Sequence, residues 1–306
     1  MTARGTTMIL GAGGFLGPHL VRAALAAGAP RVVAVRRGLD PPPGVPPHPA
    51  LAARAVDARF PRAAERLLDE EQPAAIVLSA ALASVAACRV DPEAARRLHV
   101  ELPAAVASWS ARHGTRLVLV STDLVFGGAP PRGERYAEED PPSPVHAYGR
   151  SKAAGEEAVR RLAPGALVVR LPLLYGDSAG RGLGASDSLL AAVARGERPR
   201  LFRDEWRTPL EVAAAAAAVL EALATDAAGL LHVAGPRRLS RLELGLAILR
   251  AHGAAAAGPL VEESTRAAAG MESERPADVS LDLARARGLL RTPLRAPEEV
   301  LRGAPS

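Results

Sequence analysis

The sequence has 306 residues but contains no asparagine, one glutamine and one cysteine, and aromatic residues make up only 3% of it. The lone cysteine, Cys88, excludes an internal disulfide and is typical of proteins from a reducing cytosol. Alanine runs at 213–218 and 254–257 fit the codon usage of a genome rich in G and C. The composition therefore predicts a cytoplasmic protein without a disulfide framework.

Long apolar runs are missing too. The longest uncharged apolar stretch, "AAIVLSAALASVAAC" at 74–88, has 15 residues, whereas a membrane helix needs about 20. The first residues pass from "MTARGTT" to "MILGAGG" without the apolar segment of a signal peptide. We therefore expect no membrane association.

Lysine is almost absent, because 37 of the 38 basic residues are arginine and the exception is Lys152. The net charge is only +5, and the arginines are interleaved with acidic residues. This pattern predicts no nucleic-acid partner, although a positive field favours anionic ligands. The seven histidines lack metal-ligand spacing with acids or with the cysteine, so we expect no metal site.

Short β-branched runs alternate with helical stretches through residue 176. The expected strands are 8–10, 31–37, 54–57, 74–81, 116–122 and 166–176, and the helices between them include 15–27, 61–71 and 147–162. Such alternation predicts an α/β fold with a doubly wound, parallel, Rossmann-type sheet.

The pattern becomes irregular after residue 176, with helices expected near 185–195, 210–224 and 240–252 and a strand at 230–235. We therefore divide the chain into a Rossmann domain for NADP, 1–176, and a smaller mixed α/β substrate-binding region, 177–306. Some exchange of chain between the two is expected.

A glycine array, "ILGAGGFLG", follows the first expected strand and places Gly11, Gly14 and Gly17 in a GxxGxxG pattern. Glycines there allow a tight turn and let backbone N–H groups approach a pyrophosphate at a helix N-terminus. Glycine-rich turns are common between strands and helices, but this position in an alternating chain favours a dinucleotide site.

Two arginines, Arg36 and Arg37, stand at the end of the second strand, where NAD enzymes usually carry an acidic residue for the ribose 2′-hydroxyl. A guanidinium there pairs with a 2′-phosphate, so we predict NADP(H), with NAD(H) as the alternative. In an arginine-rich chain, a solvated strand edge is the structural alternative. Asp57, after the third segment, is a candidate acceptor for the adenine amine.

The segment "YGRSK" places Tyr148 and Lys152 four residues apart, on one face of a helix. A nearby cation lowers the pKa of a tyrosine hydroxyl, and an ammonium also reaches ribose hydroxyls in a way that a guanidinium does not. A surface pair on an amphipathic helix is the structural alternative. In "STDLVF", Thr122 ends a buried strand, where its hydroxyl is placed either to polarise a carbonyl or to cap a turn.

Together these residues resemble the extended short-chain dehydrogenase/reductase family. The matching segments are "GAGGFLG", "LSAALA", "LVSTDLVFGG", "YGRSKAAGE" and "RLPLLYG". The C-terminal segments "GLLHVAGPRRLSRLELGLAIL" and "ERPADVSLDLARARGL" are similar to one branch of that family. The branch includes dTDP-4-dehydrorhamnose reductase and the regulatory β subunit of methionine adenosyltransferase.

The resemblance implies a hydride-transfer site in which Tyr148 donates a proton, Lys152 depresses the pKa of Tyr148 and holds the nicotinamide ribose, and Thr122 binds the reacting oxygen. It also implies cofactor contacts from Gly11, Gly14, Phe15, Leu16, Gly17, Arg36, Arg37, Asp57, Ala80, Ala81, Lys152 and Pro172. The implied substrate contacts are Leu82, Asp123, Leu173 and Arg207.

Three positions depart from patterns in the family. His99 stands where many members have a proton-relay asparagine, and it is either a relay itself or a core residue. Leu124 replaces the glutamate of sugar 4,6-dehydratases, which argues against dehydration. Leu173 replaces a tryptophan of the rhamnose-type reductases, as in the methionine adenosyltransferase β subunit.

The leading hypothesis is therefore an NADP-dependent reductase acting on the 4-keto group of a nucleotide-activated deoxysugar. One alternative is a regulatory subunit that binds the dinucleotide without turnover. Another is a nucleotide-sugar epimerase, against which Arg36 and Arg37 argue. A homodimer is expected from the relatives.

Overall fold

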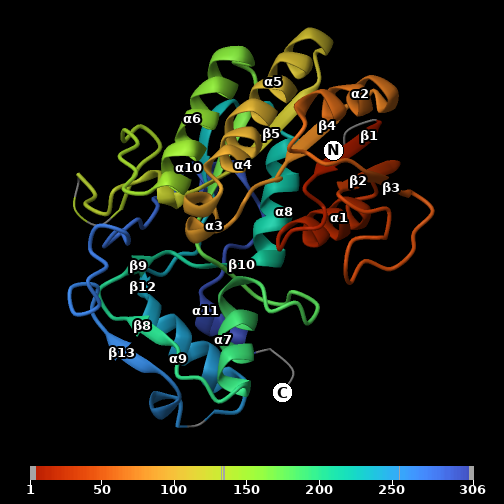
Figure 1. Cartoon of the computed structure of the whole chain (residues 1–306). Coiled ribbons are helices and arrows are strands. Elements are labelled where there is room, and N and C mark those ends of the chain that lie inside the picture. Colours follow the sequence, from red (N-terminus) through yellow and green to blue (C-terminus); the bar gives the residue numbers. More distant parts are fainter. Residues whose placement is uncertain (1–4, 132, 134, 255, 303–306) are drawn as a thin grey trace.

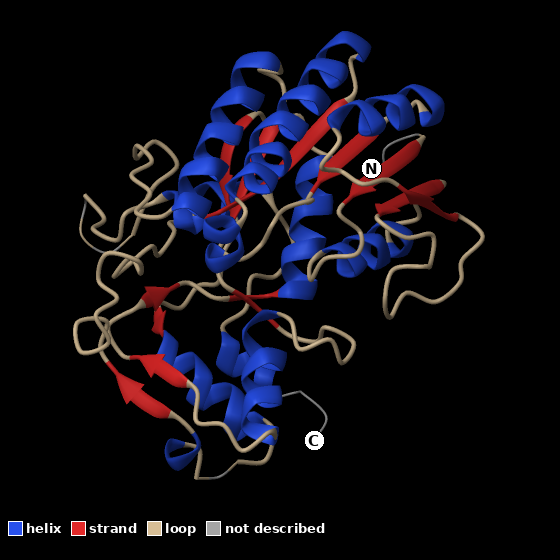
Figure 2. Ribbon diagram, viewed as in Figure 1, coloured by secondary structure: helices blue, strands red, loops and turns tan. Residues whose placement is uncertain are grey.

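The computed structural model describes residues 5–131, 133, 135–254 and 256–302. The chain forms a large lobe around one central sheet and a smaller lobe made mainly from the C-terminal half (Figure 1). Helices cover both faces of the sheet, whereas the smaller lobe carries short strand pairs beside its helices (Figure 2). The predicted α/β class with a doubly wound parallel sheet is confirmed.

The large lobe follows the predicted alternation of strands and helices. Its strands are β1 (Thr6–Leu10), β2 (Arg31–Arg36), β3 (Leu51–Ala55), β4 (Ala75–Leu78), β5 (Arg116–Thr122), β6 (Leu167–Leu171) and β11 (Gly229–His232). Its helical segments are α1 (Gly17–Ala26), α2 (Pro61–Glu71), α3 (Val85–Val90), α4 (Pro92–Arg96), the π-helical η1 (Arg97–Glu101), α5 (Leu102–His113), η2 (Asp123–Val125), α6 (Ala147–Leu162), α8 (Val212–Leu223) and α10 (Ala284–Leu289).

The smaller lobe is built from short elements. Its helical segments are α7 (Gly184–Ala194), α9 (Arg241–Ala251), η3 (Gly258–Leu260) and α11 (Pro297–Leu301). Its strands are β8 (Arg200–Phe202), β9 (Trp206–Arg207), β12 (Leu239–Ser240) and β13 (Glu262–Ser264), and the pair β7 (Leu174–Tyr175) and β10 (Leu210–Glu211) lies between the lobes.

The central sheet has the order β11-β6-β5-β4-β1-β2-β3, and every neighbouring pair is parallel. The chain runs outward from β1 in one direction and from β4 in the other, so the switch point lies between these two strands. In open α/β sheets, ligands bind beyond the carboxyl ends of the strands at such a point. A ligand site is therefore expected at the carboxyl ends of β1 and β4.

Alternate residues of each strand enter two separate cores, as the two-residue repeat of a strand requires. Ile9 of β1 packs in the core beneath α1 and α8, while its neighbours Met8 and Leu10 pack in the core beneath α2, α5 and α6. Both faces of the sheet are buried, which explains why its strands read as nearly continuous apolar runs.

The division of the chain expected at residue 176 stays a proposal. The sheet draws its seventh strand, β11, from beyond that residue, and α8 packs on α1. The strand expected at 54–57 lies instead at 51–55, because β3 pairs with β2 from Val32 opposite Leu51 to Arg36 opposite Ala55.

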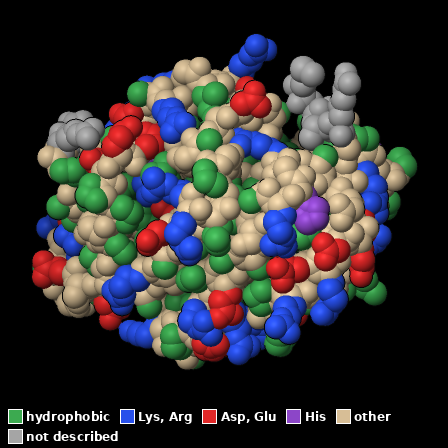
Figure 3. All heavy atoms as spheres, turned by 90° about the horizontal axis from the view of Figure 1, so that it is seen from above, with side chains coloured by type: hydrophobic (Ala, Val, Ile, Leu, Met, Phe, Trp, Pro, Cys, Tyr) green, Lys and Arg blue, Asp and Glu red, His purple; other side chains and the backbone are tan. Residues whose placement is uncertain are grey.

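No helix among the described residues is long and apolar enough to cross a membrane. On the face seen in Figure 3, basic and acidic side chains are interspersed rather than gathered into a block of one sign. No group of three or more potential metal ligands occurs in the described part of the chain.

Candidate active site

A cavity of about 640 Å³ opens at the carboxyl ends of the central strands. It is lined by the glycine loop, residues 11–17, and by Thr122, Tyr148 and Lys152. The structure brings together at this cavity most of the residues predicted from the sequence, namely Gly11, Gly14, Phe15, Leu16, Gly17, Arg36, Arg37, Asp57, Ala80, Ala81, Leu82, Thr122, Tyr148, Lys152 and Pro172. Three others, Asp123, Leu173 and Arg207, do not line it.

The glycine loop leaves no room for side chains at two positions. A Cβ at Gly17 would lie 2.3 Å from the carbonyl oxygen of Gly11, and one at Gly11, where φ is +102°, would lie 2.5 Å from the backbone nitrogen of Ala80. The backbone N–H of Phe15, just before α1, has no acceptor among the described residues. The loop thus presents backbone donors to the cavity, as an anion site at a helix N-terminus requires.

Arg36 lines the cavity next to Gly13. Its Nε lies 3.3 Å from where a Cβ of Gly13 would be, and its Nη1 donates to the carbonyl oxygens of Asp40 at 3.1 Å and Pro41 at 2.9 Å. No carboxylate in the described part of the chain forms an ion pair with Arg36. Its charge is therefore held in place by neutral groups and is available to an anion.

Asp57 is less available to accept a hydrogen bond from a ligand than the sequence suggested. Arg59 donates to both of its carboxylate oxygens, from Nε to Oδ1 at 3.0 Å and from Nη2 to Oδ2 at 2.6 Å. The same hydrogen bonds hold the pKa of Asp57 below its usual value. Arg59 itself lines the cavity, and nothing in the sequence singled it out from the other arginines.

Thr122, Tyr148 and Lys152 converge from β5 and α6. The Thr122 hydroxyl donates to Asp123 Oδ1 at 3.0 Å and accepts from the Leu124 N–H at 3.1 Å, so it caps the turn η2, and the Lys152 Nζ donates to the carbonyl oxygen of Val120 at 2.7 Å. Helix α6 approaches η2 and η1 closely because Gly149 and Gly155 carry no side chain. A Cβ at Gly149 would lie 2.2 Å from the carbonyl oxygen of Leu124.

Burial governs the ionisation of this trio. It raises the pKa of the half-buried Tyr148, to which the negative charge of Asp123 adds, and it lowers the pKa of Lys152 to about 8 against the raising influence of Glu156. The Lys152 ammonium is turned to the Val120 carbonyl, to which it donates. In this structure Tyr148 therefore keeps its proton at neutral pH.

His99 sits in the π-helical turn η1, between β4 and α6. Its Nε2 accepts a hydrogen bond from the Leu82 N–H at 3.0 Å, so Nδ1 carries the proton and donates to the Ser151 Oγ at 2.8 Å. Ser151 in turn donates to the carbonyl oxygen of Tyr148 at 2.9 Å. Both ring nitrogens are thereby committed, and burial lowers the pKa of His99 to about 3.

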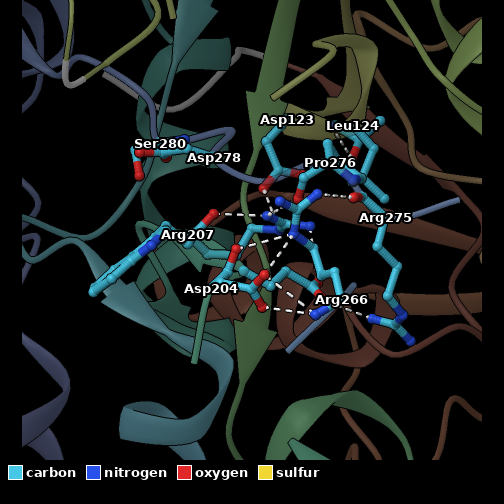
Figure 4. A network of polar contacts seen from close by, with 12 residues as sticks. Asp123, Leu124, Asp204, Arg207, Arg266, Arg275, Pro276, Asp278 and Ser280 are labelled. Carbon is cyan, nitrogen blue, oxygen red and sulfur yellow. Dashed lines mark hydrogen bonds and ion pairs between the residues drawn. The ribbon is translucent and has the colours of Figure 1, made fainter. Parts of the chain in front are cut away.

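Asp123 and Arg207 are buried members of a polar network that also includes the partly exposed Asp204, Arg266 and Arg275 (Figure 4). The Arg207 Nη2 donates to Glu205 Oε1 at 2.9 Å, and its Nε lies 3.8 Å from Asp123 Oδ2. That oxygen has no hydrogen-bond partner among the described residues, and burial raises the pKa of Asp123 to about 6.

Leu173 lies outside the cavity, whereas its neighbours Pro172 and Leu174 line it. Leu173 packs instead against the core of the smaller lobe. The sequence also did not indicate Arg181, whose guanidinium donates a hydrogen bond to Gly13 of the glycine loop, 168 residues away in the chain. Long-range contacts of this kind leave no local pattern.

Comparisons with known proteins agree with this geometry. The family model described as RmlD substrate binding domain matches residues 5–304. The probable low-salt glycan biosynthesis reductase Agl14 of Haloferax volcanii is 30% identical, over 92% of this chain and 91% of that protein. The dTDP-4-dehydrorhamnose reductase of Mycobacterium tuberculosis is 33% identical, over 81% of this chain and 75% of its own length.

A solved structure of a hypothetical dTDP-4-dehydrorhamnose reductase from Sulfolobus tokodaii superposes with a TM-score of 0.77 at 28% identity. The match covers 95% of this chain and 97% of that one. The similarity thus extends over both lobes and is not limited to the dinucleotide fold.

Proposed function

The chain belongs to the RmlD substrate binding domain family, and on that premise we propose that it is an NADPH-dependent reductase of the 4-keto group of a nucleotide-activated deoxysugar. The observation that carries this is the convergence of Thr122, Tyr148 and Lys152 on the same cavity that the glycine loop lines. The reductases among the relatives favour this function over a regulatory subunit or an epimerase.

The cavity fits a dinucleotide in size and in chemistry. The unpaired N–H of Phe15 and the close-packed Gly11 and Gly17 suit the pyrophosphate, and Arg36 and Arg37 suit the 2′-phosphate of NADP(H). NAD(H) would use the same cavity without that phosphate. Further wall contacts would come from Leu16, Ala80, Ala81 and Pro172. Asp57, already paired with Arg59, would contribute chiefly as part of the wall.

Each residue of the site has a separate role in reducing a ketone. When bound, the cofactor supplies the hydride that the carbonyl carbon receives. Tyr148, which burial keeps protonated, gives its proton to the carbonyl oxygen. The Thr122 hydroxyl donates a hydrogen bond to the same oxygen. Lys152 keeps an ammonium near the cavity floor, where it is placed to hold ribose hydroxyls.

Substrate contacts are assigned to the side of the cavity facing the smaller lobe. Leu82 lines the cavity directly. Asp123 and Arg207 lie next to it, and Arg207 would meet a diphosphate only if its contact with Glu205 opened. Leu173, just before β7, would act through its packing against the core of the smaller lobe. We further propose a cytoplasmic location, consistent with the buried free thiol of Cys88, and a homodimer, which sedimentation would test.

The test is the absorbance of NADPH in a single-turnover mixture with a panel of nucleotide 4-keto sugars, dTDP forms included. We expect oxidation with one sugar and none without it. Tyr148→Phe should bind NADPH normally and lower the rate by about 10²–10⁴-fold, the usual contribution of a general acid. Saturable NADPH binding without oxidation across the panel would indicate the regulatory subunit instead. Unchanged turnover in Tyr148→Phe would refute the assigned role.

A further inference from the structure

A strap of residues 177–184 connects β7 to α7 and runs along the glycine loop. It is sharply turned, since Ala179, Gly180, Gly182 and Gly184 all have φ between +57° and +74°. Its end fits closely on the loop, because a Cβ at Gly184 would lie 2.3 Å from the ring of Phe15. The strap thus joins the first residues of the smaller lobe to the loop expected to hold a pyrophosphate.

Arg181 is the main link between the strap and the loop. Its Nη1 donates to the carbonyl oxygen of Gly13 at 2.9 Å and its Nη2 to that of Gly14 at 3.2 Å, while its Nε donates to the carbonyl of Ser178 at 2.7 Å. All three groups of the guanidinium fork are thereby used on backbone oxygens. No carboxylate in the described part of the chain forms an ion pair with Arg181, so its charge stays beside the loop.

The strap is itself anchored at its N-terminal end. Ser178 is buried, and its backbone N–H donates to Asp187 Oδ2 of α7 at 2.8 Å. Directly before it, the carbonyl oxygen of Asp177 lies 2.9 Å from Nε2 of His19, in the first turn of α1. Arg181 therefore holds the loop against a fixed support rather than against a free side chain.

The hydrogen bond from Arg181 to the carbonyl oxygen of Gly14 determines the direction in which the next backbone N–H, that of Phe15, points. A peptide group is planar and trans, so the C=O of Gly14 and the N–H of Phe15 point in opposite directions. With the carbonyl held by Arg181, that N–H faces away from the strap, and it has no acceptor among the described residues. The carbonyl of Gly13 is held in the same way, and the N–H of Gly14 donates to Gly11 at 3.1 Å.

We propose that Arg181 is a positioning residue for the cofactor, which fixes the glycine-loop peptides so that the Phe15 N–H is presented to the pyrophosphate. This inference rests on the proposed function, because it assumes that the cavity takes a dinucleotide. It assigns to the smaller lobe a direct share in cofactor binding, through a side chain that lies outside the cavity wall.

The test compares ligands that differ in one phosphate group. Arg181→Gln should raise the Kd for NADPH and for NADH by the same factor, roughly tenfold, because both carry the pyrophosphate. It should leave the affinity for adenosine 2′-monophosphate, which has no pyrophosphate, unchanged. Arg36→Gln should show the converse pattern, weakening NADPH and adenosine 2′-monophosphate but not NADH.

Two further variants separate positioning from charge and from stability. Arg181→Lys keeps the charge but cannot bridge both carbonyls with one planar fork, so its Kd should lie between those of wild type and Arg181→Gln. Arg195→Gln removes an exposed arginine from the end of α7 and should change none of the affinities. At saturating NADPH, Arg181→Gln should keep kcat within about twofold while KM for NADPH rises in step with Kd.

The outcomes are distinct. If the wild type binds neither dinucleotide, the proposed function fails. If it binds NADPH and Arg181→Gln binds it equally well, or if Arg181→Lys equals the wild type, the positioning role is wrong. If Arg181→Gln does not fold, the comparison of Arg181→Lys with the wild type decides.

Discussion

Glu156 and Arg170 form an ion pair in the interior of the sheet lobe, one helical turn from Lys152. The Arg170 Nη2 lies 2.7 Å from Glu156 Oε2, and both side chains are at most 3% exposed. Ser121 of β5 also donates to Glu156, and the guanidinium lies 4.9 Å from the centre of the Phe126 ring. The helix that carries Tyr148 and Lys152 is thus fixed to β5 and β6 by buried charges.

Breaking this ion pair on one side should destabilise the protein strongly. Arg170→Met leaves Glu156 as an uncompensated buried charge, at a cost of about 3–5 kcal/mol in the free energy of unfolding. Adding Glu156→Gln to that variant should recover part of the loss, which urea titration of the two variants will measure. The exposed pair Arg195–Glu197 is the matched control, and breaking it should cost less than about 1 kcal/mol. Equal losses in the two pairs would contradict the expectation.

The activity should decline as the pH rises through about 8. Burial lowers the pKa of Lys152 to about 8, so its ammonium is lost there, while Tyr148 keeps its proton to higher pH. The pH profile of kcat/KM between 6 and 10 will show this alkaline limb. Lys152→Arg, whose guanidinium does not titrate in that range, should be slower but should lack the limb. A limb with the same midpoint in Lys152→Arg would assign it to another group.

Stability should fall on the acidic side because of His99. Its pKa is about 3 in the folded protein and 6.5 as the ordinary value, so below pH 6.5 the unfolded chain takes up a proton that the folded chain does not. The stabilising contribution is complete above pH 6.5 and is lost as the pH falls toward 3, with a limiting slope of about 1.4 kcal/mol per pH unit. Burial acts on His232 in the same direction.

Urea unfolding between pH 7 and 5 will measure that slope. His99→Gln keeps an acceptor for the Leu82 N–H but does not titrate, and its stability should fall less steeply with acid than that of the wild type. Replacing the exposed His48 by glutamine should leave the slope unchanged. Parallel curves for the wild type and His99→Gln would show that His99 takes up protons equally in the folded and unfolded states.

Gly17→Ala should abolish tight NADPH binding. The added Cβ would meet the backbone of Gly11 and Ala12 at 2.3–2.6 Å, so the loop must move away from its place at the start of α1. We expect the Kd for NADPH to rise by at least about 100-fold, as equilibrium fluorescence titration would show. Gly165→Ala has no atom within 4 Å of its new Cβ and is the control, with binding unchanged. Normal binding by Gly17→Ala would place the pyrophosphate elsewhere.

Local patterns predicted the parts of the fold that depend on local physics. The apolar run of β5 and the helix from Ala147 to Leu162 lie where the sequence placed them, because apolar periodicity and bounding turn residues fix such elements. The shift of β3 has a simple reason. "LAARA" has little pattern of its own, and its pairing with β2 decides its bounds.

The site was predictable to the extent that its residues stand at the ends of strands or on one helix face. Gly17, Thr122 and Lys152 belong to short motifs of that kind, and all three reach the cavity. Two other contacts were not predictable: the pairing of Asp57 with Arg59 and the hydrogen bonds from Arg181 to the glycine loop. Both depend on the directions of side chains, which the spacing of residues in the sequence does not determine. The π-helical turn that holds His99 likewise leaves no signal, since its residues read as ordinary helix.

The seventh strand of the sheet also determines the order in which this protein can form. During synthesis β6 remains an open edge, with unpaired backbone groups, until residue 232 has left the ribosome, because its partner β11 is separated from it by the first part of the smaller lobe. The sheet lobe is therefore not an early folding unit that waits for the rest of the chain. A nascent chain halted shortly before β11 would expose an aggregation-prone strand edge.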